Sequence, residues 1–330
     1  MPSRMALIES TCLCINLPDR PSNTLESCAS PADKAASTMS RAAPFVALMD
    51  SVVGGAGKYA AGISAGWMQG RTTFGGCSAA LCLEGARRRL LEDAARDALP
   101  TLRSAQVSFV GAAGGEVEIV ASIVRQGKAM SFVRADLYSS PKPDAPRQLA
   151  TTALFAFGAA RESALDADYA PAVDTELPSP DQCGPFFDPA NSEFRPQFTH
   201  NFDARLAQGF PPFSGAASSE LWLWVRHLAE SDESAGGLRA HVAPDVALLA
   251  LADMPPPAIC SRLSQVKPVS SVTWQINFLR DSSLSDPADW WLVHTRAEHA
   301  RHGYSSQDMA IWNSEREPCA TARQCVAYFD

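Results

Sequence analysis

The sequence predicts an α+β fold in which one unit, an antiparallel sheet wrapped around a central helix, occurs twice in tandem. Two observations predict this. In each half of the chain a strand precedes a single apolar helix, and later segments alternate apolar and polar residues with a period of two. In addition, residues 148–154 (Gln-Leu-Ala-Thr-Thr-Ala-Leu) resemble residues 318–324 (Pro-Cys-Ala-Thr-Ala-Arg-Gln), 170 positions later. The shared order of elements and the short stretch of similar sequence together favour an internal duplication.

Composition supports two folded domains and argues against several classes of protein. Of the 330 residues, 46% are hydrophobic and 19% are charged, which is ample material for two cores. The net charge of −8 and the lack of a basic block argue against a general binder of nucleic acid or anionic membranes. The longest strongly apolar run, residues 246–252, is far shorter than the roughly 20 residues of a membrane-spanning helix.

The cysteines and the N-terminal composition indicate the cellular compartment. Nine dispersed cysteines form no pair of Cys-x-x-Cys clusters, so no structural zinc site is expected. An odd number of cysteines, some in apolar stretches, is typical of reduced thiols in a cytoplasmic protein, with a peroxisome or another organelle left open. Glu9 interrupts the only apolar stretch near the N-terminus, which argues against a secretory signal. Residues 1–50 are therefore expected to be a leader, either disordered or created by a start codon assigned too far upstream.

The first unit is expected over residues 51–160. Its predicted elements are a strand at 58–67, a helix at 77–90 and strands at 117–123, 129–138 and 149–157. The helix is rich in Ala, Leu and Arg, and Gly75 and Gly76 before it let the backbone enter tightly. Residues 111–115 (Gly-Ala-Ala-Gly-Gly) lack the lysine and the helix of a phosphate-binding loop and predict a hairpin turn.

The second unit repeats this order over residues 194–330, after a non-periodic linker at 161–193. Its predicted elements are strands at 198–206 and 220–227, a helix at 244–253, and strands at 270–279, 290–302, 306–312 and 319–329. Pro244 suits the first turn of the helix, and three prolines at 255–257 end it. A long antiparallel sheet around one apolar helix is the hot-dog arrangement, so the whole chain predicts a double hot-dog.

Over residues 55–330 the chain resembles the acyl-CoA thioesterase II type of the hot-dog superfamily. In the first half the resemblance rests on residues 74–76 (Phe-Gly-Gly) and the helix that follows. In the second half it rests on residues 202–206, 221–225, 250–255, 270–278, 300–303 and 319–324. The resemblance implies hydrolysis of acyl-CoA to a free acid and CoA, a role in lipid metabolism, no cofactor or metal, and a homodimer or higher homo-oligomer. It does not select the arginines that would meet the phosphates of CoA.

In that family an Asp, a Ser or Thr and a Gln of the second unit hold and activate a water molecule, and the matching residues here are Asp253, Ser271 and Gln324. Asp253 shares a helical face with apolar residues, and the resulting desolvation raises the pKa of a carboxylate and makes it a better base. Gln324 alternates with apolar residues on its strand and needs polar partners if buried. Ser270, beside Ser271, is an alternative match for the hydroxyl.

The expected mechanism is general-base hydrolysis, in which Asp253 takes a proton from a water that Ser271 and Gln324 orient. Backbone N–H groups would stabilise the oxyanion, either near Gly75 and Gly76 or in the loop before Pro244. Family members often carry an Asp-His pair two residues after the hydroxyl. Residues 273–274 are Thr-Trp here, which indicates a divergent branch with altered substrate preference.

Several alternatives accompany this interpretation. Glu84 on the first helix is a rival acid, although a solvated helix-face glutamate is favoured. The histidines 294, 299 and 302 are too widely spaced along a strand for a shared metal ion. A hot-dog hydratase or dehydratase needs a paired Asp and His, and His241 lies too many helical turns from Asp253. A non-catalytic acyl-binding or acyl-CoA-binding protein would keep the apolar groove without needing all three polar residues.

Overall fold

The computed structural model describes residues 45–93, 99–140, 145–173, 176–187, 195–228 and 237–329. Its helices are α2 (Phe45–Asp50), α3 (Gly75–Asp93), α4 (Gly237–His241) and α5 (Pro244–Ala252). The first-half strands are β1 (Val53–Gly55), β2 (Lys58–Ile63), β3 (Met68–Gln69), β4 (Thr72–Thr73), β5 (Thr101–Phe109), β6 (Gly115–Gln126), β7 (Met130–Ser139) and β8 (Gln148–Gly158). The second-half strands are β9 (Phe202–Gly209), β10 (Glu220–His227), β11 (Val269–Phe278), β12 (Trp291–Arg301), β13 (Tyr304–Trp312) and β14 (Pro318–Tyr328).

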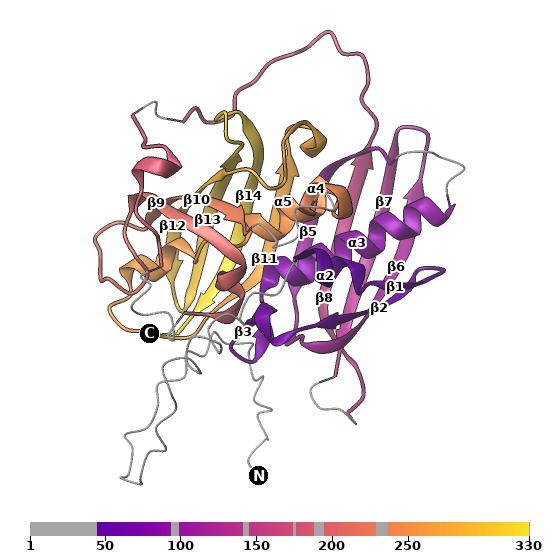
Figure 1. The fold of residues 1–330 in the computed structure, drawn as a ribbon, viewed down its shortest axis with the longest axis horizontal. Coiled ribbons are helices and arrows are strands. Elements are labelled where there is room, and N and C mark those ends of the chain that lie inside the picture. Colours follow the sequence, from indigo (N-terminus) through magenta and orange to yellow (C-terminus); the bar gives the residue numbers. More distant parts are fainter. Residues whose placement is uncertain are drawn as a thin grey trace.

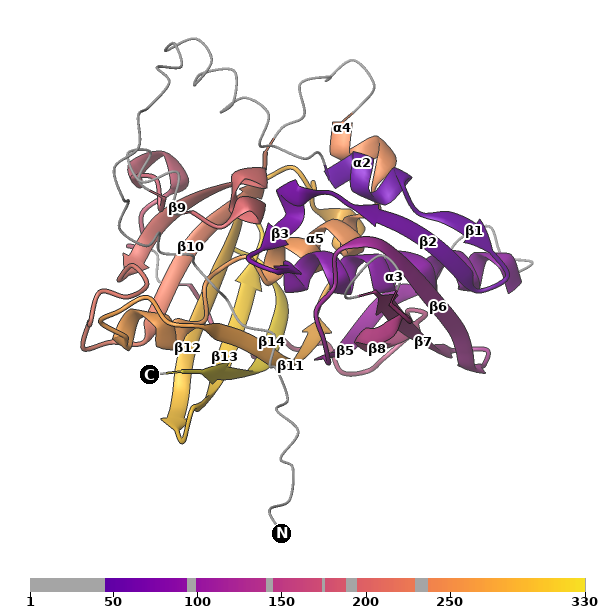
Figure 2. The same cartoon turned by 90° about the horizontal axis from the view of Figure 1, so that it is seen from below.

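One antiparallel sheet runs through both halves of the molecule (Figure 1). Its strand order is β1-β2-β6-β7-β8-β5-β11-β14-β13-β12-β10-β9. The order on one side of the β5–β11 junction mirrors the order on the other, and Gln106 of β5 faces Gln275 of β11 at the centre of that junction. Each half curls around its own helix, α3 or α5, as Figure 2 shows from below. The double hot-dog fold predicted by the sequence is therefore present.

The two central helices lie side by side and antiparallel, which brings the end of α5 to the start of α3. At one end, a Cβ on Gly76 would lie only 2.3 Å from the backbone oxygen of Ala250, so only glycine permits this approach. At the other end, Arg87 of α3 pairs with Asp245 in the first turn of α5 at 2.7 Å. Because every residue from Asp245 to Ala252 is buried, α5 forms the core of the second half.

The structure departs from the sequence predictions at several places. The strand predicted at 58–67 ends at Ile63, because Ala65–Trp67 forms a 3-10 helix. Strand β5 was not predicted, because its apolar residues are interrupted by serines and a glutamine. The hairpin turn predicted at 111–115 is wrong: β5 pairs with β8 and β11 whereas β6 pairs with β2 and β7, so this segment crosses between non-adjacent strands. The strand predicted at 198–206 begins only at Phe202, because Gln197–Asn201 forms a short 3-10 helix, η4.

Residues 45–50 of the expected leader form α2, whose Phe45 packs edge-on against Trp67 and stacks on His227. Residues 1–44, with the rest of the expected leader, lie outside the described residues. None of the helices in the described ranges combines the length and apolarity needed to cross a bilayer.

Part of the segment between the halves packs on the outer face of the second-half sheet. Trp224 donates its indole N–H to the backbone oxygen of Pro178 (2.9 Å), and Trp312 donates to that of Pro171 (3.1 Å). Leu177 and Cys183 are buried against the same tryptophans. Two indole donors on the outer face, on either side of Leu292 of β12, therefore anchor an otherwise irregular stretch of chain.

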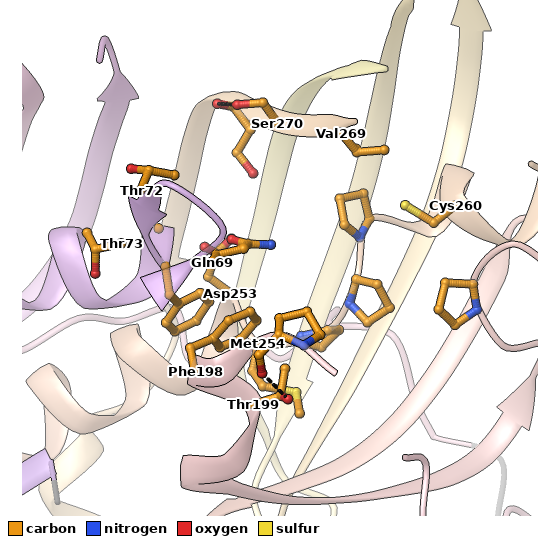
Figure 3. Close-up of a pocket in the computed structure, with 18 of the residues that line it drawn as sticks. Gln69, Thr72, Thr73, Phe198, Thr199, Asp253, Met254, Cys260, Val269 and Ser270 are labelled. Carbon is orange, nitrogen blue, oxygen red and sulfur yellow. Dashed lines mark hydrogen bonds between the residues drawn. The ribbon is translucent and has the colours of Figure 1, made fainter. Parts of the chain in front are cut away.

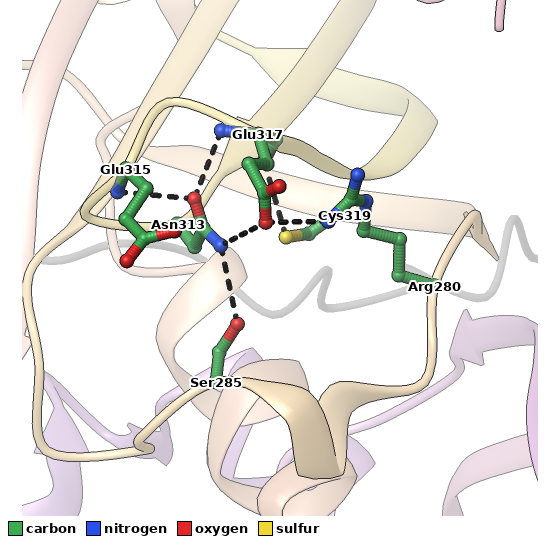
Figure 4. A network of polar contacts seen from close by, with 6 residues as sticks. All are labelled: Arg280, Ser285, Asn313, Glu315, Glu317 and Cys319. Carbon is green, nitrogen blue, oxygen red and sulfur yellow. Dashed lines mark hydrogen bonds and ion pairs between the residues drawn. The ribbon is translucent and has the colours of Figure 1, made fainter.

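The β13–β14 hairpin is closed by the side chain of Asn313 (Figure 4). Its Oδ1 accepts from the backbone N–H groups of Glu315 (3.1 Å) and Glu317 (2.9 Å), and its Nδ2 donates to Glu317 Oε2 (3.0 Å). Arg280 pairs with the same carboxylate. This turn fixes the register of β14, the strand that carries Gln324.

Candidate active site

Asp253 occupies the position at which the apolar helix α5 ends. It is the C-cap of α5, and Met254 and three prolines lead the chain away. The carboxylate also lies at the N-terminus of α3, because a Cβ on Gly75 would come within 2.6 Å of Asp253 Oδ2. The backbone N–H of Gly76 donates to this carboxylate. The positive end of the α3 dipole thus offsets the unfavourable position of a negative charge at the end of α5.

Ser271 is turned toward Asp253 by an irregularity in β11. In this strand Trp274, Ile276 and Phe278 are buried, so even-numbered residues face the interior and Ser271 would face outward in a regular strand. The pairing of β11 with β14 shifts register between Ser271 and Thr273, and such a bulge reverses the facing of the residues before it. Ser270 also lines the cavity, but its hydroxyl donates to the backbone oxygen of Ser271 (3.4 Å), whereas Ser271 Oγ accepts from Gln324, so Ser271 is the hydroxyl that joins the polar group.

The amide of Gln324 joins the other two side chains. Its Nε2 donates to Asp253 Oδ1 at 2.9 Å and to Ser271 Oγ at 2.8 Å. Gln324 lies on the inner face of β14 and is 4% exposed. The structure thus brings together the acid, the hydroxyl and the amide that the sequence analysis selected, from three elements that are far apart in the chain.

Gln307 on β13 is a further member of the site that the sequence analysis missed. It faces Gln324 in the strand register and is 1% exposed. The backbone N–H of Ala258, the first residue after the prolines, donates to Gln307 Oε1 (2.9 Å), and Gln307 Nε2 donates to Gln324 Oε1 (2.6 Å). Because a backbone N–H can only donate, the atom of Gln307 that faces Ala258 must be the amide oxygen, and its NH₂ group must face Gln324. The amide oxygen of Gln324 then accepts from Gln307, so the NH₂ group of Gln324 must face Asp253 and Ser271.

Burial changes the acid–base character of Asp253. Desolvation raises the pKa of this carboxyl to about 7, although the hydrogen bonds from Gln324 and from the Gly76 backbone act in the opposite direction. Asp253 retains partial exposure because one side of it faces a cavity. A carboxylate with a pKa near neutrality is suited to accept and return a proton at physiological pH.

The cavity beside the three side chains has a volume of about 550 Å³ and a mainly apolar wall (Figure 3). Asp253, Ser271 and Gln324 form one polar corner, together with Gly75 at the start of α3. The apolar wall includes the residues Phe109, Phe186, Phe187, Phe198, Phe213, Met254, Pro255 and Pro256. An apolar cavity with a few convergent polar groups is the form expected of a small-molecule site.

The remaining sequence candidates lie elsewhere. Glu84 pairs with Arg88 on the same helix at 2.6 Å, and His294 Nε2 donates to Glu220 Oε1 at 2.8 Å while the imidazole stacks on Trp222. His241 ends α4 and is exposed. Within the described ranges, no three His, Cys, Asp or Glu side chains are grouped closely enough to hold a metal ion.

The two expected oxyanion donors lie at opposite ends of α5. The start of α3 lines the cavity, whereas the loop before Pro244 lies next to the Arg87–Asp245 pair. Trp274, on the inner face of β11, is buried in the core.

Each half of the chain matches a known domain family. The chain matches a model of the acyl-CoA thioesterase N-terminal domain over residues 63–158 and one of the acyl-CoA thioesterase C-terminal domain over residues 180–328. Among curated proteins, no relative matches at a significant level.

Solved structures show the same fold. A conserved hot-dog-fold protein of unknown function from Alicyclobacillus acidocaldarius is similar with a TM-score of 0.68 and 22% identity, over 86% of this chain and 98% of that one. An acyl-CoA thioesterase II from Mycobacterium marinum is similar with a TM-score of 0.61 and 17% identity, over 86% and 98% of the two chains. Since the two domain matches together span most of the chain, this protein belongs to the acyl-CoA thioesterase family of thioester hydrolases.

Proposed function

We propose that this protein hydrolyses acyl-CoA thioesters with a water molecule activated by Asp253. The observation that carries the proposal is the meeting of Asp253 and Ser271 on the amide of Gln324, at the polar corner of an apolar cavity. The apolar wall suits an acyl chain, and the polar corner suits a water beside the thioester carbonyl.

The proposed reaction assigns one task to each group. Asp253 takes a proton from the water, whose oxygen bonds to the thioester carbon while Ser271 and Gln324 hold it in place. The carbon–sulfur bond then breaks, and Asp253 returns the proton to the departing CoA thiolate. Gly75, as the first residue of α3, has no acceptor for its N–H within the helix, and this N–H is our proposed oxyanion donor.

A hydratase or dehydratase is less well supported by the same cavity. Such an enzyme would pair an acid with a histidine, and no histidine is among the described residues that line the cavity. A purely acyl-binding protein would need the cavity but gains nothing from a buried, desolvated carboxylate, which lowers stability.

The test is release of free thiol from a panel of acyl-CoA substrates of different chain length. We expect turnover of at least one member, and a loss of about 10²-fold or more in kcat for Asp253→Asn, because the general base is removed. Glu84→Gln is the matched control, since this carboxylate is outside the cavity and should leave kcat unchanged. Absence of turnover across the panel, or an unaffected Asp253→Asn variant, would reject the proposal.

A further inference from the structure

The cavity has an uneven distribution of charge. Among the described residues that line it, only Asp253 and Arg195 carry ionisable charges of opposite sign, and every other lining residue is apolar or neutral. Asp253 belongs to the polar corner already described. Arg195 has no role in the proposed reaction, so its position needs a separate explanation.

Arg195 is held at the cavity wall by contacts with two residues. Its Nε donates to Thr199 Oγ1 (2.8 Å), one Nη donates to the backbone oxygen of Thr199 (2.5 Å), and the guanidinium lies 4.3 Å above the ring of Phe187. Thr199 and Phe198 belong to η4, and Figure 3 shows both on the same side of the cavity as Asp253 and Met254. These contacts use two of the five N–H donors and leave the remaining ones for a ligand.

The charge of Arg195 is not neutralised within the part of the chain that the structure describes. None of the ion pairs there includes Arg195. Asp203, the carboxylate whose charge acts on it, is engaged by Arg205 (3.1 Å) and Arg226 (3.2 Å). Burial lowers the pKa of Arg195, which reflects an unfavourable environment for a cation. An anion bound at this point would offset that desolvation.

We propose that Arg195 anchors an anionic oxygen group of the thioester substrate in this cavity. The matching chemistry is a phosphate or a carboxylate, because a guanidinium offers parallel N–H donors to two oxygens of either group. In an acyl-CoA that group is a phosphate of CoA or a carboxylate at the far end of the acyl chain. This inference rests on the function proposed above and adds a polar contact to an otherwise apolar binding site.

Phe198 connects the anchor to the reaction centre. Its ring stacks on Phe74 at 4.2 Å between centroids, and Phe74 directly precedes Gly75. A substrate fixed by Arg195 is therefore fixed relative to the α3 N-terminus and to Asp253, so the anchor would help to orient the thioester as well as to bind it.

The experiment compares Arg195→Gln and Arg195→Lys with wild type on four thioesters of equal chain length. Two carry CoA and two carry the uncharged N-acetylcysteamine, and within each pair one acyl chain ends in a methyl group and the other in a carboxylate. We expect Arg195→Gln to raise KM about tenfold for the thioesters that carry the recognised anion, and much less for those without it. A penalty confined to CoA identifies a phosphate, and one confined to the carboxylate-terminated chains identifies the acyl end.

Arg195→Lys keeps the positive charge and should show the same selectivity among the four thioesters with a smaller rise in KM. If Arg195→Gln does not fold, the inference is tested with Arg195→Lys alone. Arg147→Gln is the control, since Arg147 is a surface residue of the first half that pairs with Glu118. An equal change for all four thioesters, or no change, overturns the inference while leaving the hydrolase proposal intact.

Binding can be measured without turnover, which separates the two proposals. If wild-type protein hydrolyses none of the thioesters, calorimetry measures the binding of two pairs of ligands. The first pair is CoA and pantetheine, and the second is a dicarboxylic acid and the monocarboxylic acid of equal length. The anchor is supported if one member of a pair binds about tenfold more tightly and Arg195→Gln removes that difference. Equal binding within both pairs overturns it.

Discussion

At the scale of single residues, the site depends on the orientation of one amide. A glutamine can turn its amide by half a rotation, and only one orientation presents NH₂ to Asp253 and Ser271. The chain of hydrogen bonds from Ala258 N–H through Gln307 to Gln324 selects that orientation. Gln324 was selected through the resemblance to the family, and its alternation with apolar residues agreed with an inward position. Gln307 carries the same signal, because it alternates with Met309 and Ile311, but its role follows only from the register of β13 and β14.

Replacing Gln307 by Leu should therefore reduce activity without touching the substrate. The Oε1 atom of Gln324 would lose its donor, and its amide could turn away from Asp253. We expect kcat to fall about tenfold or more with a smaller change in KM, and the free energy of unfolding to fall by about 1–3 kcal/mol. Steady-state kinetics and denaturant unfolding measure the two effects.

Asp308→Asn is the control for this variant, because Asp308 is the next residue of β13 and points to the outer face, near Arg323. Its kcat should match that of wild type. An unchanged kcat for Gln307→Leu would show that Gln324 keeps its orientation without Gln307.

The raised pKa of Asp253 predicts the pH dependence of the reaction. A general base must be unprotonated, and this carboxyl loses its proton near pH 7. We expect kcat/KM to rise with pH through about 7 and to level off above it. A profile that is flat between about pH 5 and 9, or that falls through this range, would contradict the assignment of Asp253 as the base.

At the scale of elements, the site forms where a strand bulge and two helix ends coincide. Most strands and both central helices could be predicted, because alternation and apolar runs are local signals. The bulge after Ser271 could not be predicted, because the register of a strand is set by its partner strand. Without the bulge, Ser271, an odd-numbered residue of β11, would face outward. Strand β5 was missed for a related reason: its pairing with β8 and β11 supplies the stabilisation that its own short polar residues lack.

The contact between α3 and Asp253 gives a prediction for Gly75→Ala. The new Cβ would lie 2.6 Å from Asp253 Oδ2, so the carboxylate or the helix start must shift. A displacement of about 1 Å at a reacting group lowers rates by about 10²-fold, and we expect a loss of that order in kcat. Gly184→Ala is the matched control, because a Cβ there has open space and should change nothing. Full activity of Gly75→Ala would mean that the carboxylate tolerates displacement.

At the scale of the whole molecule, one continuous sheet carries two units of which only the second holds the three polar residues. The 170-position alignment predicts Leu154 as the first-half counterpart of Gln324, but strand pairing gives Phe155 instead, because Phe155 pairs with Ala105 of β5 as Gln324 pairs with Trp274 of β11. Phe155 is buried and supplies no amide. Both halves nevertheless build the site, since α3 of the first half provides Gly75 and Gly76 beside Asp253. From the sequence, the three side chains were expected in the second half, and the oxyanion donor was left open between Gly75 and Gly76 and the loop before Pro244, because contacts between the two helices cannot be deduced from either repeat separately.

The buried acid is expected to lower the stability of the fold at neutral pH. The folded protein binds this proton up to about pH 7, whereas the unfolded chain releases it near the ordinary value of 3.8. The protonated carboxyl therefore makes its full contribution to the free energy of unfolding below about pH 3.8. This contribution, on the order of 4 kcal/mol, is lost as the pH rises from there through about 7.

Asp253→Asn removes this titration. We expect it to be more stable than wild type at about pH 8, with a difference that shrinks as pH falls toward 4. Thermal or denaturant unfolding across that range measures the effect. A variant that is less stable than wild type at the higher pH would show that the ionised carboxylate stabilises the fold.

The proposal that Asp253 activates water, and does not itself bond to the acyl group, is tested most directly by one turnover in water labelled with heavy oxygen. With protein in excess over acyl-CoA, we expect that the free acid carries one labelled oxygen and that the peptide containing Asp253 remains unlabelled. An unlabelled acid together with a labelled Asp253 peptide would contradict it, because the oxygen of the product would then have come from the carboxylate.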